Sequence, residues 1–351
     1  MTCGAAAPSW KRSGSCRKQS ESHRALHTAT LLNGSVRPCQ RASPLPFTPF
    51  IFIMCNGRVW GVPTESPERA RFTRGNTVEL KLVRHLWGLA EPLDRLLPEI
   101  TAAGYTAIEN AAPATGDAER FREHMAAFGM SFIAQVFTQG QTVREHLESF
   151  RQQLEYAAGF RPLFINSHSG LDRWSEAQAE GFFAEALKIE EALGIEVAHE
   201  THRGRTLYNP WTTDLLIEKF PALNLTLDLS HWVCVCERLL DGPELDVVRR
   251  CAERCLHLHA RVGYEEGPQV PDPRAPEFAA HLSAHQAWWD LVWNAQERRG
   301  QAVSTLTPEY GPDLYLHALP YTRMPVADLV SVCDWQARRE AERFSRRARR
   351  D

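Results

Sequence analysis

The chain has 351 residues, of which 43% are hydrophobic and 24% charged, a composition typical of a globular protein with a sizeable core. Its charge is uneven, because residues 1–75 contain 11 Lys and Arg against 3 Asp and Glu, whereas the rest contains 29 against 40. An acidic folded part argues against nucleic acid as the main ligand, since phosphate binding needs clustered cations. No apolar run reaches the roughly 18 residues of a membrane helix, so no contact with a membrane is expected.

Residues 1–75 differ in composition from the rest of the chain. They are rich in Ser, Arg and Ala and nearly free of acidic residues, and they lack sustained hydrophobic periodicity. This pattern predicts a disordered extension rather than part of a folded domain. An Arg-rich and Ser-rich start is also typical of an organelle-targeting peptide, which residues 1–53 could supply. The alternative is an upstream extension without function, with the protein proper beginning at Met54.

Nine cysteines are scattered along the chain without a CxxC pair. Such spacing indicates reduced thiols rather than a disulfide framework. We therefore expect an intracellular protein, located in the cytoplasm unless residues 1–53 direct it to an organelle.

From residue 78 onward, short apolar runs alternate with amphipathic stretches that end at Gly or Pro. The expected strands are 78–88, 106–110, 130–137, 162–170, 195–204, 223–232, 256–264 and 303–311. Helical patterns between them include 92–105, 142–160 and 175–194, the last with a Ser175 cap and a Gly194 stop. Eight such units in about 235 residues predict an α/β fold, a (β/α)8 TIM barrel over residues 76–330. An open doubly wound sheet is the alternative, but no GxGxxG follows the first strand.

Polar residues collect where the expected strands end, which is the face of a TIM barrel that carries the active site. Side-chain alternation along four consecutive strands allows Glu200, Asp228, His259 and Glu309 to face one point. Three carboxylates at one point would repel each other strongly unless a cation lay between them. The sequence therefore predicts a divalent metal with these four residues as ligands.

The order of these residues resembles the xylose isomerase-like TIM barrel superfamily, in which Glu, Asp-x-x-His, His and Glu stand on the fifth to eighth strands. The resemblance covers about residues 78–325 and includes LPEITAAGYTAIEN (97–110), TLDLSHW (226–232), LHLHARVG (256–263) and LTPEYGP (306–312). It implies the same four metal ligands and places His231 beside the metal or the substrate. The superfamily includes sugar isomerases, ketose 3-epimerases, inosose and dehydroshikimate dehydratases, and endonuclease IV-type DNA-repair enzymes. The segment HARVGYEEGPQVPDP (259–273) departs from the more usual His-x-Lys-Asp or His-x-Gly-Glu, which puts the substrate in doubt more than the metal.

Each proposed ligand also has a purely structural interpretation. Asp228 could cap the end of a strand or pair only with His231. His257 competes with His259 for the ligand position, because residues two apart share a strand face; His259 is preferred since it lies nearer the strand end.

Other polar and aromatic residues are candidate substrate contacts, and each could instead be a structural group. Six are predicted to bind the substrate: His231, Arg261, His168, His202, Glu109 and Trp232. Glu109 could alternatively transfer a proton. Arg203 and Arg261 could bind oxygen anions of a substrate or simply neutralise an acidic rim. Most tryptophans are expected in helix packing, with Trp87 and Trp232, at strand ends, as the exceptions.

Mixed carboxylate and imidazole ligation suits Mn²⁺, Mg²⁺, Co²⁺ or Zn²⁺. Such an ion would polarise a carbonyl of a carbohydrate or polyol-like substrate and acidify the neighbouring C–H, with Glu200 and Glu309 removing and returning the proton. This predicts a metal-dependent sugar isomerase or epimerase of carbohydrate metabolism. A dehydratase of a cyclic polyol or hydroxy acid is the main alternative. An endonuclease IV-like phosphodiesterase is disfavoured by the acidic charge of the folded part.

Two further segments carry expectations of their own. Residues 263–278 are rich in Pro and Gly, and we expect a lid over the site. Residues 331–351 form a basic helical pattern that could cover the barrel bottom, join a homo-oligomer interface or remain a solvated tail.

Overall fold

The computed structural model describes residues 52–55, 58–61 and 78–347. The chain divides into two units, residues 1–71 and 72–351. In the first unit the structure describes strands β1 (Phe52–Cys55) and β2 (Arg58–Gly61), which pair antiparallel. The other residues of the predicted extension lie outside the described residues. They include residues 1–51 of the targeting sequence expected within residues 1–53.

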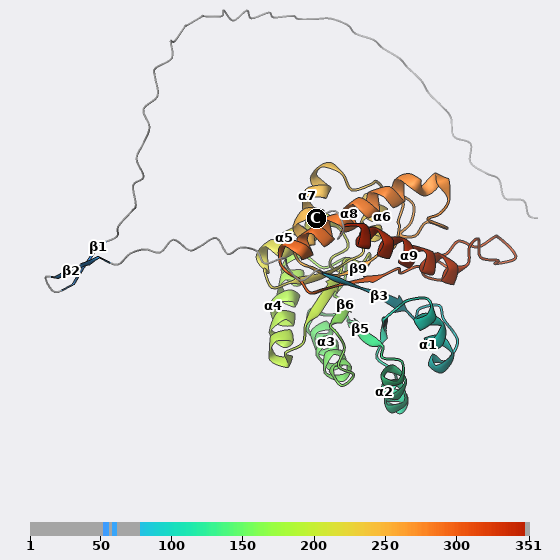
Figure 1. Cartoon of the computed structure of the whole chain (residues 1–351), viewed down its shortest axis with the longest axis horizontal. Coiled ribbons are helices and arrows are strands. Elements are labelled where there is room, and N and C mark those ends of the chain that lie inside the picture. The colour runs from blue at the N-terminus through green and yellow to red at the C-terminus, as the bar shows by residue number, and fades with distance from the viewer. Residues whose placement is uncertain (1–51, 56–57, 62–77, 348–351) are drawn as a thin grey trace, which may run out of the picture. The chain divides into compact units, whose positions relative to one another are not determined.

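The second unit is a closed barrel of eight parallel strands, in the order β10-β3-β4-β5-β6-β7-β8-β9 (Figure 1). The strands are β3 (Glu79–His85), β4 (Ala107–Ala111), β5 (Ser131–Phe137), β6 (Ile165–His168), β7 (Val197–Glu200), β8 (Asn224–Leu227), β9 (Cys255–His259) and β10 (Val303–Thr307). Each one lies within or beside a strand expected from the apolar runs. The predicted TIM barrel is confirmed.

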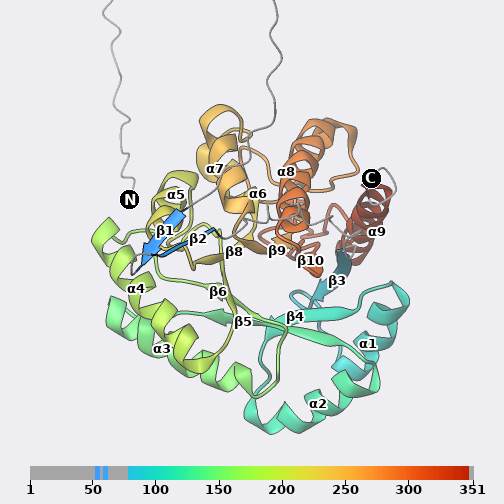
Figure 2. The ribbon, with the colours of Figure 1, turned by 60° about the vertical axis from the view of Figure 1, so that its left-hand side comes forward.

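Helices follow the strands around the outside of the barrel (Figure 2). They are α1 (Leu93–Ala102), α2 (Ala118–Ala127), α3 (Val143–Ala158), α4 (Glu176–Leu193), α5 (Pro210–Lys219), α6 (Leu229–Cys236), α7 (Gly242–Ala252), α8 (Ala279–Arg298) and α9 (Leu329–Arg347). Helix α4 begins and ends as its sequence predicts. Ser175 and Gln178 form a reciprocal capping box, and Gly194 ends the helix with φ 64°, a conformation that suits glycine.

Several strands are shorter at their C-terminal ends than the sequence predicts. The apolar run 223–232 is the clearest case, because β8 ends at Leu227 and α6 begins at Leu229. Asp228 stands between them as the helix N-cap and accepts a hydrogen bond from the Ser230 backbone N–H at 3.0 Å. His231 therefore lies on the first turn of a helix and not on a strand, so side-chain alternation does not apply to it.

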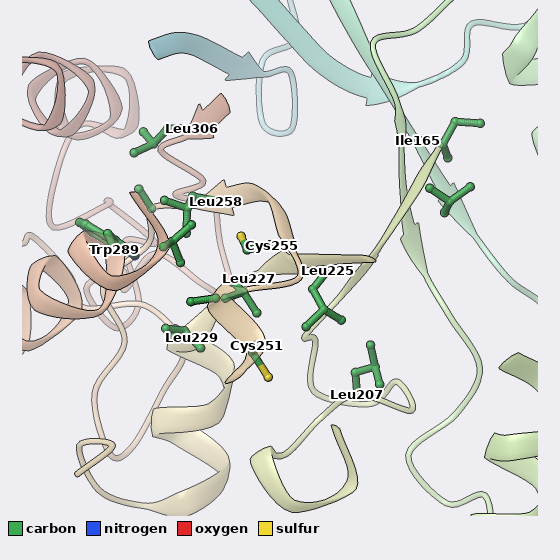
Figure 3. Close-up of a cluster of buried hydrophobic side chains, with 14 of the residues drawn as sticks. Ile165, Leu207, Leu225, Leu227, Leu229, Cys251, Cys255, Leu258, Trp289 and Leu306 are labelled. Carbon is green, nitrogen blue, oxygen red and sulfur yellow. The ribbon is translucent and has the colours of Figure 1, made fainter. Parts of the chain in front are cut away.

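The main core lies between the barrel and its helices. Leu225, Leu227 and Leu229 from β8 and α6 pack with Leu258 of β9 and Trp289 of α8 (Figure 3). A smaller cluster comprises four strand residues and Phe164, which directly precedes β6: Val83, Ala107, Ile133, Phe164 and Ala198. The helices pack around the outside of the barrel. The residues that follow the strands therefore lie together at one rim, the C-terminal face of the barrel.

Helix α9 is a packed part of this unit and not a solvated tail. It lies next to α8 and to β3 (Figure 2), and Glu340 is buried, where it accepts hydrogen bonds from Gln286 of α8 and Gln336. Tyr105, just after α1, donates to Asp334 at 3.0 Å. These contacts close the helix ring between the last and first barrel strands.

His285 of α8 makes stability depend on pH. Its Nδ1 donates to the His281 carbonyl at 2.9 Å and its Nε2 accepts the Gly263 N–H at 3.2 Å, and burial lowers its pKa to about 3. The unfolded chain binds a proton at this residue below about pH 6.5, whereas the folded chain does not. Lowering the pH from 7.5 to 5 should therefore cost about 2 kcal/mol of unfolding free energy through His285 alone.

Urea unfolding at the two pH values checks this expectation. The His285→Gln variant keeps a donor and an acceptor but cannot be protonated, so its loss of stability between pH 7.5 and 5 should be smaller than that of the wild type. Equal losses in both proteins would contradict the assignment.

Candidate functional site

The four predicted ligands come together at the rim formed by the strand ends. Glu200 is the last residue of β7 and His259 the last of β9, whereas Asp228 follows β8 directly and Glu309 lies two residues beyond β10. All four side chains are buried, and one ligand atom from each lies within 4.8 Å of the others. We call these four residues the ligand cluster.

Distances within the ligand cluster suit a divalent ion. His259 Nδ1 lies 3.1 Å from Glu309 Oε2, 3.6 Å from Glu200 Oε1 and 3.9 Å from Asp228 Oδ2. Ligand atoms about 2.1 Å from a common ion would be separated by about 3.0–3.5 Å. His259 Nδ1 and Glu200 Oε1 are buried without a hydrogen-bond partner in the described part of the chain, which is uncommon for buried polar atoms. The residues therefore fit a metal.

Charges inside the cluster are strongly coupled to each other. Burial opposes ionisation of Glu200, but His168 and His259 outweigh it and hold the pKa of its carboxyl well below the usual value. The pKa of Glu309 is also lowered, because His259 and Arg261 outweigh the effect of burial. For Asp228 burial prevails over the nearby Arg261 and raises the pKa to about 6. All three carboxylates are therefore ionised at neutral pH, and Asp228 is the first of them to bind a proton as the pH falls.

Arg261 contacts the ligand cluster and partly neutralises its negative charge. Its Nη2 donates to Asp228 Oδ2 at 2.5 Å and to His231 Nε2 at 2.7 Å, and lies 3.2 Å from Glu309 Oε2. His231 is 3.8 Å from Asp228, so these two residues do not satisfy each other alone. Because it accepts from a guanidinium, His231 is neutral, and burial lowers its pKa well below the usual value.

Glu109 lies beneath His259 and is fully buried. It accepts hydrogen bonds from His259 Nε2 at 3.1 Å, His257 Nε2 at 3.2 Å, Asn166 Nδ2 at 3.0 Å and Thr307 Oγ1 at 2.7 Å. With Nε2 donating to Glu109, the Nδ1 of His259 faces the ligand cluster. Carboxylates commonly orient metal-binding histidines in this way. Glu109, predicted from the sequence as a substrate contact, is thus surrounded by hydrogen-bond donors of the protein itself.

Removing the charge of Glu109 should weaken metal binding without unfolding the protein. In Glu109→Gln the side chain can no longer accept from all its neighbours and the orientation of His259 is loosened, so Mn²⁺ affinity should fall about 10- to 100-fold. Isothermal titration with Mn²⁺ measures the change. Glu340→Gln, another buried glutamate but in α9, is the matched control and should bind as the wild type does. Unchanged affinity in Glu109→Gln would contradict this role.

Three histidines line one side of the cluster. His168 Nε2 approaches Glu200 Oε2 to 2.8 Å, and the His202 ring lies 4.7 Å from that of His168 and 3.9 Å from that of His231. His202 Nδ1 donates to the Arg203 carbonyl at 2.5 Å, and burial lowers its pKa to about 3. The structure therefore brings these three predicted substrate contacts together as neighbours of Glu200.

Trp232 is placed elsewhere. It is fully buried in the main core, and its indole N–H donates to the Leu207 carbonyl at 3.0 Å. The reason is the helix that begins at Leu229, which directs Trp232 away from the rim. The structure does not bring it to the cluster.

Tyr315 and Asn166 are site residues that the sequence did not single out for a role. The Tyr315 ring lies 5.0 Å from the Arg261 guanidinium and 5.1 Å from that of Arg203, with Trp87 edge-on at 4.9 Å. Asn166 donates to both Glu109 and Glu200, at 3.0 and 2.8 Å. Asn166 was visible as a polar strand end, whereas Tyr315 belongs to no strand or helix pattern.

The segment 263–278 is anchored by hydrogen bonds at Gln269 and Val270. Gln269 is buried, donates to the Gly311 carbonyl at 3.1 Å and accepts the Gly311 N–H at 2.7 Å. Val270 also pairs with the carbonyl of Val262 at 2.9 Å. The lid over the site that the Pro-rich sequence suggests stays a prediction.

Comparison with known proteins agrees with this fold. Residues 97–277 match a family model described as Xylose isomerase-like TIM barrel. A xylose isomerase-like TIM barrel protein from Mycobacterium smegmatis, solved in complex with magnesium, is 12% identical, with a TM-score of 0.51 over 75% of this chain and 96% of that one.

Two other similar structures are enzymes by name. A probable 3-DHS dehydratase from Bacillus anthracis is 12% identical over 74% of this chain and 97% of its own, with a TM-score of 0.49. A 3-keto-D-glucoside 4-epimerase from E. coli is 10% identical over 74% and 97%, also at 0.49. No curated protein sequence matches the chain. None of the helices in the described ranges has the length and apolar character that a membrane span requires.

Proposed function

The chain belongs to the xylose isomerase-like TIM barrel family, and on this premise we propose that it is a divalent-metal-dependent isomerase or epimerase of a ketose or polyol-like substrate. Its metal, one of Mn²⁺, Mg²⁺, Co²⁺ or Zn²⁺, would be held by the ligand cluster of Glu200, Asp228, His259 and Glu309. The observation that carries this proposal is a pair of buried atoms, His259 Nδ1 and Glu200 Oε1, which lie 3.6 Å apart in the ligand cluster and have no hydrogen-bond partner within the described ranges.

When bound there, a divalent ion would polarise a substrate carbonyl and stabilise the negative charge that develops on its oxygen. The protein's own residues would handle the proton. Glu200 and Glu309 are ionised at neutral pH because their pKa values are lowered, so either can accept a proton from the carbon next to the carbonyl. They reach the cluster from β7 and β10, which are not neighbours, so one can remove the proton and the other return it.

Neighbouring side chains support these roles. Asn166 Nδ2 holds Glu200 Oε2 at 2.8 Å, which fixes the carboxylate while leaving Oε1 toward the cluster. His168, 2.8 Å from the same oxygen, can relay a proton from Glu200. His202 and His231, both neutral, can position substrate hydroxyl groups by donating or accepting hydrogen bonds.

Exchange with deuterated water tests the proposal. The purified, Mn²⁺-loaded protein is incubated with candidate ketoses and cyclic polyols in deuterated water, and the products are examined by NMR. Deuterium at the carbon next to the carbonyl, together with an isomer or epimer, is the expected result. A dehydrated product would assign the reaction to a dehydratase instead, and no exchange with any candidate would count against proton abstraction.

A further inference from the structure

One end of the Arg261 guanidinium, its Nη1 group, has no hydrogen-bond partner in the described part of the chain. Its Nη2 is engaged by Asp228 and His231, but its Nη1 is buried without a hydrogen-bond partner among the described residues, and the side chain is only 1% exposed. A buried charged N–H group left unpaired costs more than a neutral one. An acceptor for Nη1 is therefore expected in the working protein.

A second guanidinium, that of Arg203, contacts the same Tyr315 ring as Arg261 does. Arg203 follows Glu200 by three residues, and its contacts in the described structure are the Tyr315 ring at 5.1 Å and Cys234 Sγ at 3.9 Å. No carboxylate of the described chain pairs with it. Arg203 thus forms no ion pair with the described chain, which favours binding of an oxygen anion over the alternative that the sequence left open, neutralising the acidic rim.

We propose that the substrate carries an anionic oxygen group, a carboxylate or a phosphate. Arg203 and Arg261 would bind this group beside the Tyr315 ring that both guanidinium groups contact. This rests on the proposed function, because the metal centre would hold the carbon skeleton next to that group. Arginine side chains bind both kinds of oxyanion through paired N–H donors. A neutral sugar could accept from these N–H groups through its hydroxyl oxygens, but it would leave the Arg203 guanidinium without an anionic partner.

Three probes with one carbon skeleton test this inference: D-glucitol, D-gluconate and D-glucitol 6-phosphate. Isothermal titration measures their binding to the full-length, Mn²⁺-loaded protein. We expect one of the two anions to bind at least about tenfold more tightly than D-glucitol, and the preferred one identifies carboxylate or phosphate. In Arg203→Gln this preference should disappear while the Mn²⁺ affinity stays unchanged.

Arg249→Gln is the matched control, since Arg249 is exposed on α7 and pairs with Asp246. It removes the same charge and should keep the preference. Equal binding of all three probes, no measurable binding of either anion, or a preference that survives in Arg203→Gln would overturn the inference. Failure of Mn²⁺ binding, or of deuterium exchange with any substrate, would instead count against the proposed function, so the two are distinguishable.

Discussion

Replacing Glu200 or Glu309 with Gln is expected to lower turnover by about 1000-fold while the fold is retained. Glutamine has nearly the same shape but cannot accept a proton, and a positioned general base contributes about 10²- to 10⁴-fold to such reactions. Both side chains are buried and their pKa values are lowered, so water does not readily take over their role. The rate of deuterium incorporation at saturating Mn²⁺ measures the effect.

Saturating metal is needed because both residues are also proposed ligands. Comparison with Asp228→Asn separates the two roles, since Asp228 bonds to Arg261 and Ser230 and is assigned no proton transfer. Its activity should recover as the Mn²⁺ concentration is raised, whereas Glu200→Gln and Glu309→Gln should remain inactive. If all three variants recover alike, Glu200 and Glu309 are ligands alone.

Removing the metal should abolish activity and destabilise the protein. A ligand that binds only the folded state stabilises it by about 4 kcal/mol at 1000 times its dissociation constant. The midpoint of thermal unfolding should therefore fall on treatment with a chelator and be restored by Mn²⁺. Calorimetry with and without Mn²⁺ measures the shift, and elemental analysis gives the stoichiometry, expected to be one ion per chain.

His259→Ala is the control for this experiment. It removes the ligand whose Nδ1 faces all three carboxylates, so its melting midpoint should not respond to Mn²⁺. A wild-type protein that melts at the same temperature with and without Mn²⁺ would show that Arg261 and His259 alone suffice to balance the carboxylates.

The barrel and the ligand cluster were predictable because their signals are local. Each barrel strand is a short apolar run, and a carboxylate such as Glu200 at the end of such a run is conspicuous. Strand order then brings the four strand ends together, since consecutive parallel strands in a barrel are neighbours. No knowledge of side-chain packing was needed for this step.

Other parts of the site depend on contacts that a sequence does not display. The hydrogen bond from His259 to Glu109 joins residues 150 positions apart, so the surroundings of Glu109 follow only from the closed barrel. Trp232 was misplaced because the helix that starts after Asp228 is short and its apolar residues continue those of the strand. Tyr315 was missed because it lies in an irregular segment, where periodicity carries no information.

The bond between Gln269 and Gly311 has a consequence for engineering this protein. Gly311 sits between Glu309 and Tyr315 in the chain, and a Cβ there would collide with the Trp87 ring at about 2.1 Å. The hydrogen bonds of Gln269 thereby connect the segment after β9 to the segment after β10. The latter contains the proposed base Glu309 and Tyr315, whose ring contacts two arginines. Exchanging residues 263–278 for those of a relative, as is often done to broaden specificity, would disturb catalysis too unless the graft retains an amide side chain at position 269.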